Sequence, residues 1–176
     1  MDLKEIINDK LLKPKVKTEL LSQHLLEAKD GIDQIIILAS SAKDPVRATC
    51  IEAIEFATKI KPEIAGSSCL DFVTANLAAK APRVKWESAK VIGNIAHLFP
   101  DRLALPVEKL LVNSENPGTV VRWSAAYALG EIIKLNTSLN TELLPAARAI
   151  IEREEKNSIK KIYLEAFRKL TKDLKK

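Results

Sequence analysis

The chain has 176 residues, carries a net charge of +5 and is 47% hydrophobic. This composition is typical of a folded chain with one continuous core and excludes an intrinsically disordered protein. No apolar run is long enough for a membrane-spanning helix, and the first residues lack the pattern of a signal peptide, so we expect a cytoplasmic protein that does not bind membranes.

Helices are predicted along the whole chain, because apolar residues recur with helical spacing and no segment alternates as a strand does. Asp-Gly, Asp-Pro and Asn-Pro-Gly sequences mark several of their ends. The helices whose two ends can be predicted cover residues 3–12, 16–29, 32–41, 62–80, 105–113 and 119–133. With the remaining helices we predict five pairs in a single domain, over residues 1–30, 31–61, 62–99, 100–136 and 137–176.

A short motif recurs four times, each time at the start of the second helix of a pair. Its copies are Val46-Arg47, Val84-Lys85-Trp86, Val121-Arg122-Trp123 and Ile159-Lys160-Lys161, at intervals of 38, 37 and 38 residues. Recurrence at such a period is typical of a repeat array, in which each unit is too small to bury its own apolar face and packs on its neighbours. The sequence therefore predicts a solenoid.

The motif resembles a known family. The stretch from Val121 to Ile132 matches Val-Arg-x-x-Ala-x-x-Ala-Leu-Gly-x-Ile, the second-helix pattern of the HEAT repeats, at every specified position. The stretch from Val84 to Ile95 is similar to it with four substitutions. The resemblance implies an all-α, armadillo-like fold: a right-handed α-solenoid superhelix of about five antiparallel helix pairs, whose second helices line the concave face.

Helical phase predicts which side chains the second helices present on that face. Counted from the first Val or Ile of each motif, positions 1, 5, 8, 9 and 12 cluster on the core side at about 100° per residue, and positions 3, 7, 10 and 14 lie opposite. Trp86 and Trp123 both fall at position 3 of this concave strip. The predicted partner-binding residues are Trp86, Lys90, His97, Trp123, Tyr127, Lys134, Lys161 and Arg168.

Two interpretations of the tryptophans stay open at this point. Aromatic rings beside cations suit an acidic or aromatic peptide, a partner helix, or unstacked nucleic-acid bases. A large residue at position 3 can equally cover the seam between neighbouring helix pairs and act as a packing group. The exposure of the two rings distinguishes the binding surface from the packing role.

The sequence offers little that is typical of catalysis. His24 and His97 are the only histidines, and neither they nor Cys50 and Cys69 have the spacing of a metal site. No nucleophile elbow and no glycine-rich phosphate loop occurs. We therefore predict a non-enzymatic scaffold, without catalytic residues, metal or cofactor, that binds an unidentified protein or peptide on its concave face.

Nucleic-acid binding is the alternative. Residues 156–176 contain eight Lys or Arg and two acidic residues, an excess of six positive charges, whereas the first 155 residues are nearly neutral. DNA alkylation-repair glycosylases built from HEAT-like repeats are similar in combining tryptophans, basic residues and a carboxylate in a concave cleft. In this chain the only carboxylates on the predicted strip are Glu52, Glu55 and Glu165, away from the tryptophan pair, so no catalytic residue can be assigned.

Overall fold

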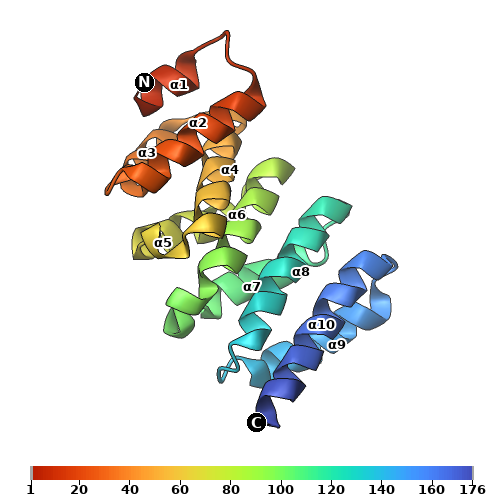
Figure 1. Cartoon of the computed structure of the whole chain (residues 1–176). Helices are drawn as coiled ribbons and strands as arrows, with labels where there is room; N and C mark the ends of the chain where they lie inside the picture. Colours follow the sequence, from red (N-terminus) through yellow and green to blue (C-terminus); the bar gives the residue numbers. More distant parts are fainter. Residues whose placement is uncertain (1, 176) are drawn as a thin grey trace.

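The computed structural model describes residues 2–175, and every regular element in that range is helical (Figure 1). Its α-helices are α1 Leu3–Asn8, α2 Pro14–Glu27, α3 Gly31–Ser41, α4 Asp44–Ile60, α5 Ser67–Asn76, α6 Pro82–Ile95, α7 Ala104–Asn113, α8 Thr119–Lys134, α9 Asn140–Arg153 and α10 Asn157–Leu174. The all-α prediction is confirmed. In this range no helix has both the length and the apolar character needed to cross a membrane.

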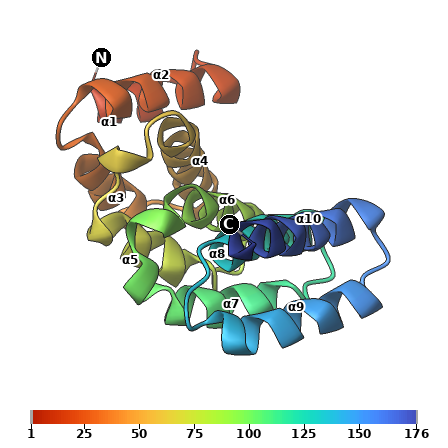
Figure 2. The same cartoon turned by 60° about the horizontal axis from the view of Figure 1, so that its bottom comes forward.

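The helices form two layers. The second helices of the pairs, α2, α4, α6, α8 and α10, pack side by side in chain order. In Figure 2 helices α3, α5, α7 and α9 follow the outer side of an arc, and the second helices lie on its inner side. This arrangement confirms the HEAT-type solenoid. We call the side of the second helices that is turned away from the first helices the inner face.

The core follows the repeat positions. All five core positions of the motif are buried in both α6 and α8. The first of them is Val84 in α6 and Val121 in α8, and the last is Ile95 in α6 and Ile132 in α8. Helix α4 follows the same pattern except at Val46, which is half-buried near the N-terminal end of the array. Burial raises the pKa of the Cys50 thiol to about 11 and that of Cys69 to about 12, so both stay protonated at neutral pH.

The arginine of the motif binds the turn that precedes its own helix. Arg47 donates from Nη2 to the carbonyl oxygen of Ala42 at 2.9 Å and from Nε to that of Ala39 at 3.2 Å. Arg122 donates from Nη1 to the carbonyl oxygen of Asn116 at 3.0 Å. Carbonyl groups at and just beyond a helix C-terminus lack helical partners, so the motif arginines cap the turns inside the pairs.

Several predicted helix ends are wrong. The helix predicted over residues 62–80 is a 3-10 turn, Pro62–Ile64, followed by α5, because the chain becomes extended at Gly66. The first helix ends at Asn8 instead of residue 12, since the Asp9 side chain accepts a hydrogen bond from the Leu11 backbone N–H at 2.7 Å and forms a turn. Helix α2 begins at Pro14, where a proline is tolerated in the first turn.

Candidate partner-binding surface

The predicted binding residues lie on three neighbouring second helices and one short turn. Trp86 and Lys90 are in α6, His97 is in the 3-10 turn Ala96–Leu98, Trp123, Tyr127 and Lys134 are in α8, and Lys161 and Arg168 are in α10. Trp123, His97, Lys161 and Arg168 are exposed, and the other four are half-buried. Their contacts divide them into groups with different physical surroundings.

Trp123 is the exposed tryptophan of the inner face, with 39% of its surface accessible. Its indole stacks on the ring of Tyr127, with the centroids 6.0 Å apart and the planes 9° from parallel. The Tyr127 ring in turn covers Gly93 of α6, where an added Cβ would lie 2.4 Å from the ring carbon Cε1. Glycine at this position of α6 therefore makes room for the ring that supports Trp123.

Hydrogen bonds hold Tyr127 in place. Its hydroxyl donates to Oδ1 of the buried Asn94 at 2.7 Å. The Nδ2 of Asn94 donates to the carbonyl oxygen of Glu55 at 3.0 Å and to the hydroxyl of Thr58 at 3.1 Å. Burial, followed by the charges of Glu131 and Glu55, raises the pKa of Tyr127 to about 12, so the hydroxyl keeps its proton. The chain of bonds links α4, α6 and α8 beneath the exposed indole.

Trp86 has different surroundings although it occupies the same repeat position. It is half-buried, and its indole Nε1 donates to Oε1 of the neighbouring Glu87 at 2.8 Å. The other oxygen of that carboxylate is 3.1 Å from Nζ of Lys90. The polar edge of Trp86 is thus already satisfied within the protein, whereas the indole N–H of Trp123 forms no hydrogen bond within residues 2–175.

Lys90 is enclosed between two buried carboxylates. Besides Glu87, its Nζ contacts Oε2 of Glu55 on α4 at 3.3 Å. Burial raises the pKa of Glu87, and the nearby Lys90 only partly offsets this. Burial by itself would lower the pKa of Lys90, but the two carboxylates together outweigh it and the pKa is raised. Lys90 therefore completes the seam between α4 and α6 and is not a free cation.

A second ion pair on the same side also joins neighbouring helices. Glu52 of α4 accepts hydrogen bonds from the Thr18 hydroxyl of α2 and from Nη2 of Arg83 of α6, both at 2.8 Å. Beside it Phe56 is 45% exposed and lines a hollow of about 180 Å³ between α2 and α4. The helical-phase argument missed Phe56, because position 11 was assigned to neither the core nor the concave strip.

The part of the inner face formed by α8 and α10 has fewer internal contacts. Lys134 pairs with Glu131 of its own helix at 2.6 Å. Lys161 and Arg168 form no ion pair with any residue of the range 2–175. Gly130 faces the side chain of Ile162, the nearest atom to an added Cβ at 3.3 Å, so the seam between these helices is apolar.

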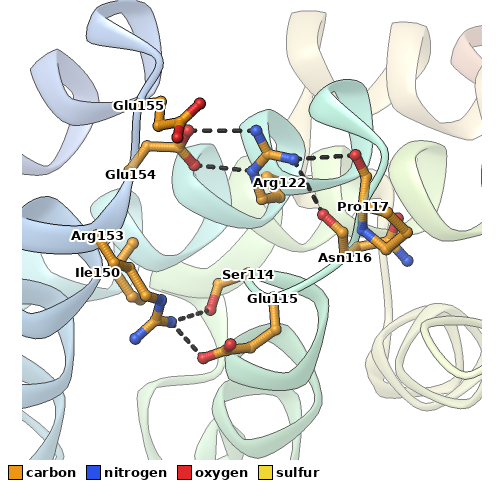
Figure 3. Close-up of a pocket in the computed structure, with 9 residues that line it drawn as sticks. All are labelled: Ser114, Glu115, Asn116, Pro117, Arg122, Ile150, Arg153, Glu154 and Glu155. Atoms are coloured by element: carbon orange, nitrogen blue, oxygen red, sulfur yellow. Dashed lines mark hydrogen bonds and ion pairs between the residues drawn. The ribbon is translucent and has the colours of Figure 1, made fainter.

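A polar pocket lies at the edge of the array, where the α7–α8 turn meets the α9–α10 turn (Figure 3). Its volume is about 320 Å³. The Arg122 guanidinium binds both oxygens of the buried Glu154, at 2.8 and 3.2 Å, and lowers the pKa of that carboxyl. Arg153 and Glu115 pair across the same pocket at 2.5 Å. These charged groups satisfy one another and connect two helix pairs.

Residues 2–175 contain no group of three or more His, Cys, Asp or Glu side chains that could hold a metal ion. The two histidines, for example, lie in different elements of the array. His24 lies in α2 near one end of the array, and His97 lies in the 3-10 turn that follows α6.

No family model and no curated protein matches this chain. Solved structures do. A chain of the complex of CpcE and CpcF of phycocyanin lyase from Nostoc sp. PCC7120 superposes with a TM-score of 0.73 and 19% identity, over 93% of this chain and 96% of that chain. The chain has a HEAT/armadillo-like repeat fold.

Two artificial proteins share that HEAT/armadillo-like architecture. An engineered protein matches with a TM-score of 0.71 and 15% identity, over 97% of this chain and 80% of that one. A computationally designed armadillo repeat protein for modular peptide recognition matches with a TM-score of 0.69 and 14% identity, over 95% and 80% of the two chains. At such identities the likeness concerns the fold alone.

Proposed function

We propose that this protein is a non-enzymatic interaction module, and that it binds a segment of a partner protein on the inner face of its HEAT/armadillo-like solenoid. The observation that carries the proposal is the exposed indole of Trp123, stacked on Tyr127. An indole stacked on a hydrogen-bonded tyrosine loses little conformational freedom when a ligand covers it, so a large apolar contact is available at a small entropic cost.

The surroundings of Trp123 support a binding role over a packing role. A tryptophan that fills a seam usually has its N–H bonded within the protein, as the half-buried Trp86 has through Glu87. Trp123 instead lies above a ring that already closes the seam between α6 and α8. Exposed aromatic side chains that are held rigidly on a concave surface are typical of the anchors in protein interfaces.

The fold supports the same proposal in a general way. A solenoid presents a row of parallel helices on its concave side, and an extended segment can contact several of them at once. The designed armadillo repeat protein with this fold was made for modular peptide recognition. The partner of the present chain is proposed to bind on the inner face.

A randomised peptide library tests the proposal. Immobilised protein should enrich a set of sequences, and Trp123→Ala should weaken the binding of the enriched peptides by about tenfold or more, measured by fluorescence anisotropy. Val112→Ala is the matched control, because Val112 is exposed on the outer helix α7. Unchanged circular dichroism shows that the variants are folded. Enrichment that is independent of Trp123 would contradict the proposal.

A further inference from the structure

Two groups of cations on the inner face differ in their ion pairs. In the first group each cation is neutralised by a carboxylate of a neighbouring helix: Arg83 by Glu52, and Lys90 by Glu55. The second group, Lys161, Arg168 and Lys172 of α10, has no ion pair within residues 2–175. The unpaired positive charge of the inner face is therefore concentrated on α10, although Lys59 of α4, at the repeat position of Lys172, also forms no ion pair within residues 2–175.

The repeat register explains this difference. In α4 the residues that reach toward α6 are Glu52 at position 7 and Glu55 at position 10. The equivalent residues of α8 are Tyr127 and Gly130, which carry no charge. The nearest carboxylate of α8, Glu131, already pairs with Lys134. Helix α8 therefore offers no free carboxylate to the cations of α10.

The unpaired cations share one side of α10. Lys161 and Arg168 are seven residues apart, about two helical turns, so their side chains emerge from the same face. Glu165 lies between them without an ion pair to either, and Leu164 beside it is 46% exposed. Lys161 occupies position 3 of its repeat, as Trp123 does on the adjacent helix α8. A row of cations thus runs beside an exposed indole and an exposed leucine.

We propose that the partner segment is acidic: an extended peptide that crosses α8 and α10, with carboxylates against Lys161 and Arg168 and an apolar side chain against Trp123. This inference rests on the proposed function and specifies the chemistry of its partner. Attraction between opposite charges selects such a partner and disfavours a basic one, since like charges placed together destabilise the complex.

The same surface is less suited to a nucleic acid. Affinity for a nucleic acid through its phosphates depends on how many phosphates the Lys and Arg side chains neutralise. Here three cations are free, Glu165 lies among them, and Glu131 is on the neighbouring helix. Mixed charge around one apolar anchor fits a short acidic peptide with apolar residues better than a polyanion.

The test uses the composition of the peptides that the full chain enriches from a library of about eight randomised positions. In extended form, at about 3.3 Å per residue, this length crosses two helices about 10 Å apart. We expect enrichment of Asp and Glu together with one large apolar residue. The double variant Lys161→Glu with Arg168→Glu should reverse the charge preference and weaken binding of the original acidic peptides by about tenfold or more.

A control separates local from overall charge. Lys43→Glu with Lys80→Glu changes the net charge by the same amount at exposed sites in the turns before α4 and α6. This variant should keep the acidic preference. An equal loss in both double variants would overturn the inference, as would an enriched pool without excess acidic residues.

Two further outcomes are distinguishable. Trp123-dependent binding of neutral or basic peptides would overturn the acidic partner and leave the proposed function standing, whereas the absence of any Trp123-dependent peptide would overturn both.

A single-stranded oligothymidine probe is measured in parallel at two salt concentrations. Tighter binding of this probe than of the acidic peptides, with a steep loss at high salt, would assign the surface to nucleic acid instead.

Discussion

The α4–α6 seam and the α8–α10 side of the inner face carry similar side chains and differ in what those side chains contact. Lys90 in the seam lies between two buried carboxylates, whereas Lys161 on α10 has no carboxylate partner within residues 2–175. Trp86 donates its N–H to Glu87, and Trp123 projects from a stacked pair. The same residue types stabilise the array on one side and remain available to a partner on the other.

Two buried glutamates extend the comparison to electrostatics. Burial raises the pKa of Glu87, because its lysine partner only partly offsets the loss of water. The hydrogen bonds from Arg122 lower the pKa of Glu154 instead. A guanidinium that binds both carboxylate oxygens stabilises the charged form more than a single ammonium contact does. Glu87 is therefore the less fully compensated of the two carboxylates.

The largest effect is expected for Lys90→Met, which leaves Glu55 and Glu87 buried without their shared cation. We expect a loss of about 3 kcal/mol in the free energy of unfolding at neutral pH, measured by chemical denaturation. Lys134→Met is the matched control, because the Lys134–Glu131 pair is more exposed. Its loss should stay within about 0.5 kcal/mol.

The pH dependence sharpens this prediction. A carboxyl group whose pKa is raised in the folded state binds its proton more tightly there than in the unfolded chain, so its charge lowers stability at neutral pH. Removing Lys90 raises the pKa of Glu87 further, and the loss should shrink as the pH falls into the acid range where Glu87 is protonated. A loss of the same size at neutral and acid pH would contradict the ion-pair explanation.

Gly93→Ala should have the next largest effect. The added Cβ would meet the Tyr127 ring at 2.4 Å, and the ring has to move away from Asn94. We expect a loss of about 2 kcal/mol from overpacking, despite the gain in helix propensity. Gly130→Ala is the control, since its Cβ would lie 3.3 Å from a single methyl group of Ile162. Equal stabilities of the two variants would refute the close-packing role of Gly93.

Tyr127→Phe removes the hydroxyl that binds Asn94 and keeps the ring. A loss of about 1 kcal/mol is expected, because the buried amide oxygen loses its donor. Tyr163→Phe provides the comparison: the Tyr163 hydroxyl is buried and has no hydrogen-bond partner within residues 2–175. Its removal should be neutral or slightly stabilising. Thermal and chemical unfolding of both variants would measure the difference, and identical losses would exclude a specific bond.

The smallest effect on stability is expected for Lys161→Glu with Arg168→Glu. Both side chains are exposed and form no ion pair within residues 2–175, so the free energy of unfolding should change by less than about 0.5 kcal/mol. The same double variant is expected to alter peptide preference strongly. A loss of stability above about 1 kcal/mol would mean that these cations contribute to the fold, which would remove the distinction between the two sides of the inner face.

Much of the fold was predictable from local patterns. The apolar positions of the motif predicted the buried side of α6 and α8, because helical periodicity depends only on residues a few places apart. Helix ends were less predictable. Pro62 begins a 3-10 turn in place of a long helix, and Asp9 ends the first helix early through its own side chain. Such side-chain and backbone competition is not visible in apolar spacing.

The sequence by itself determined the repeat, the helix pairs and the alignment of Trp86 with Trp123 on one side. Only the tertiary structure decided which of the two indoles is exposed and which cations are free. These outcomes depend on contacts across helices, such as Lys90 with Glu55 and Tyr127 with Gly93, between residues some 35 places apart in the chain. A lysine that pairs and a lysine that does not look the same in sequence, because the carboxylate that distinguishes them comes from a neighbouring repeat.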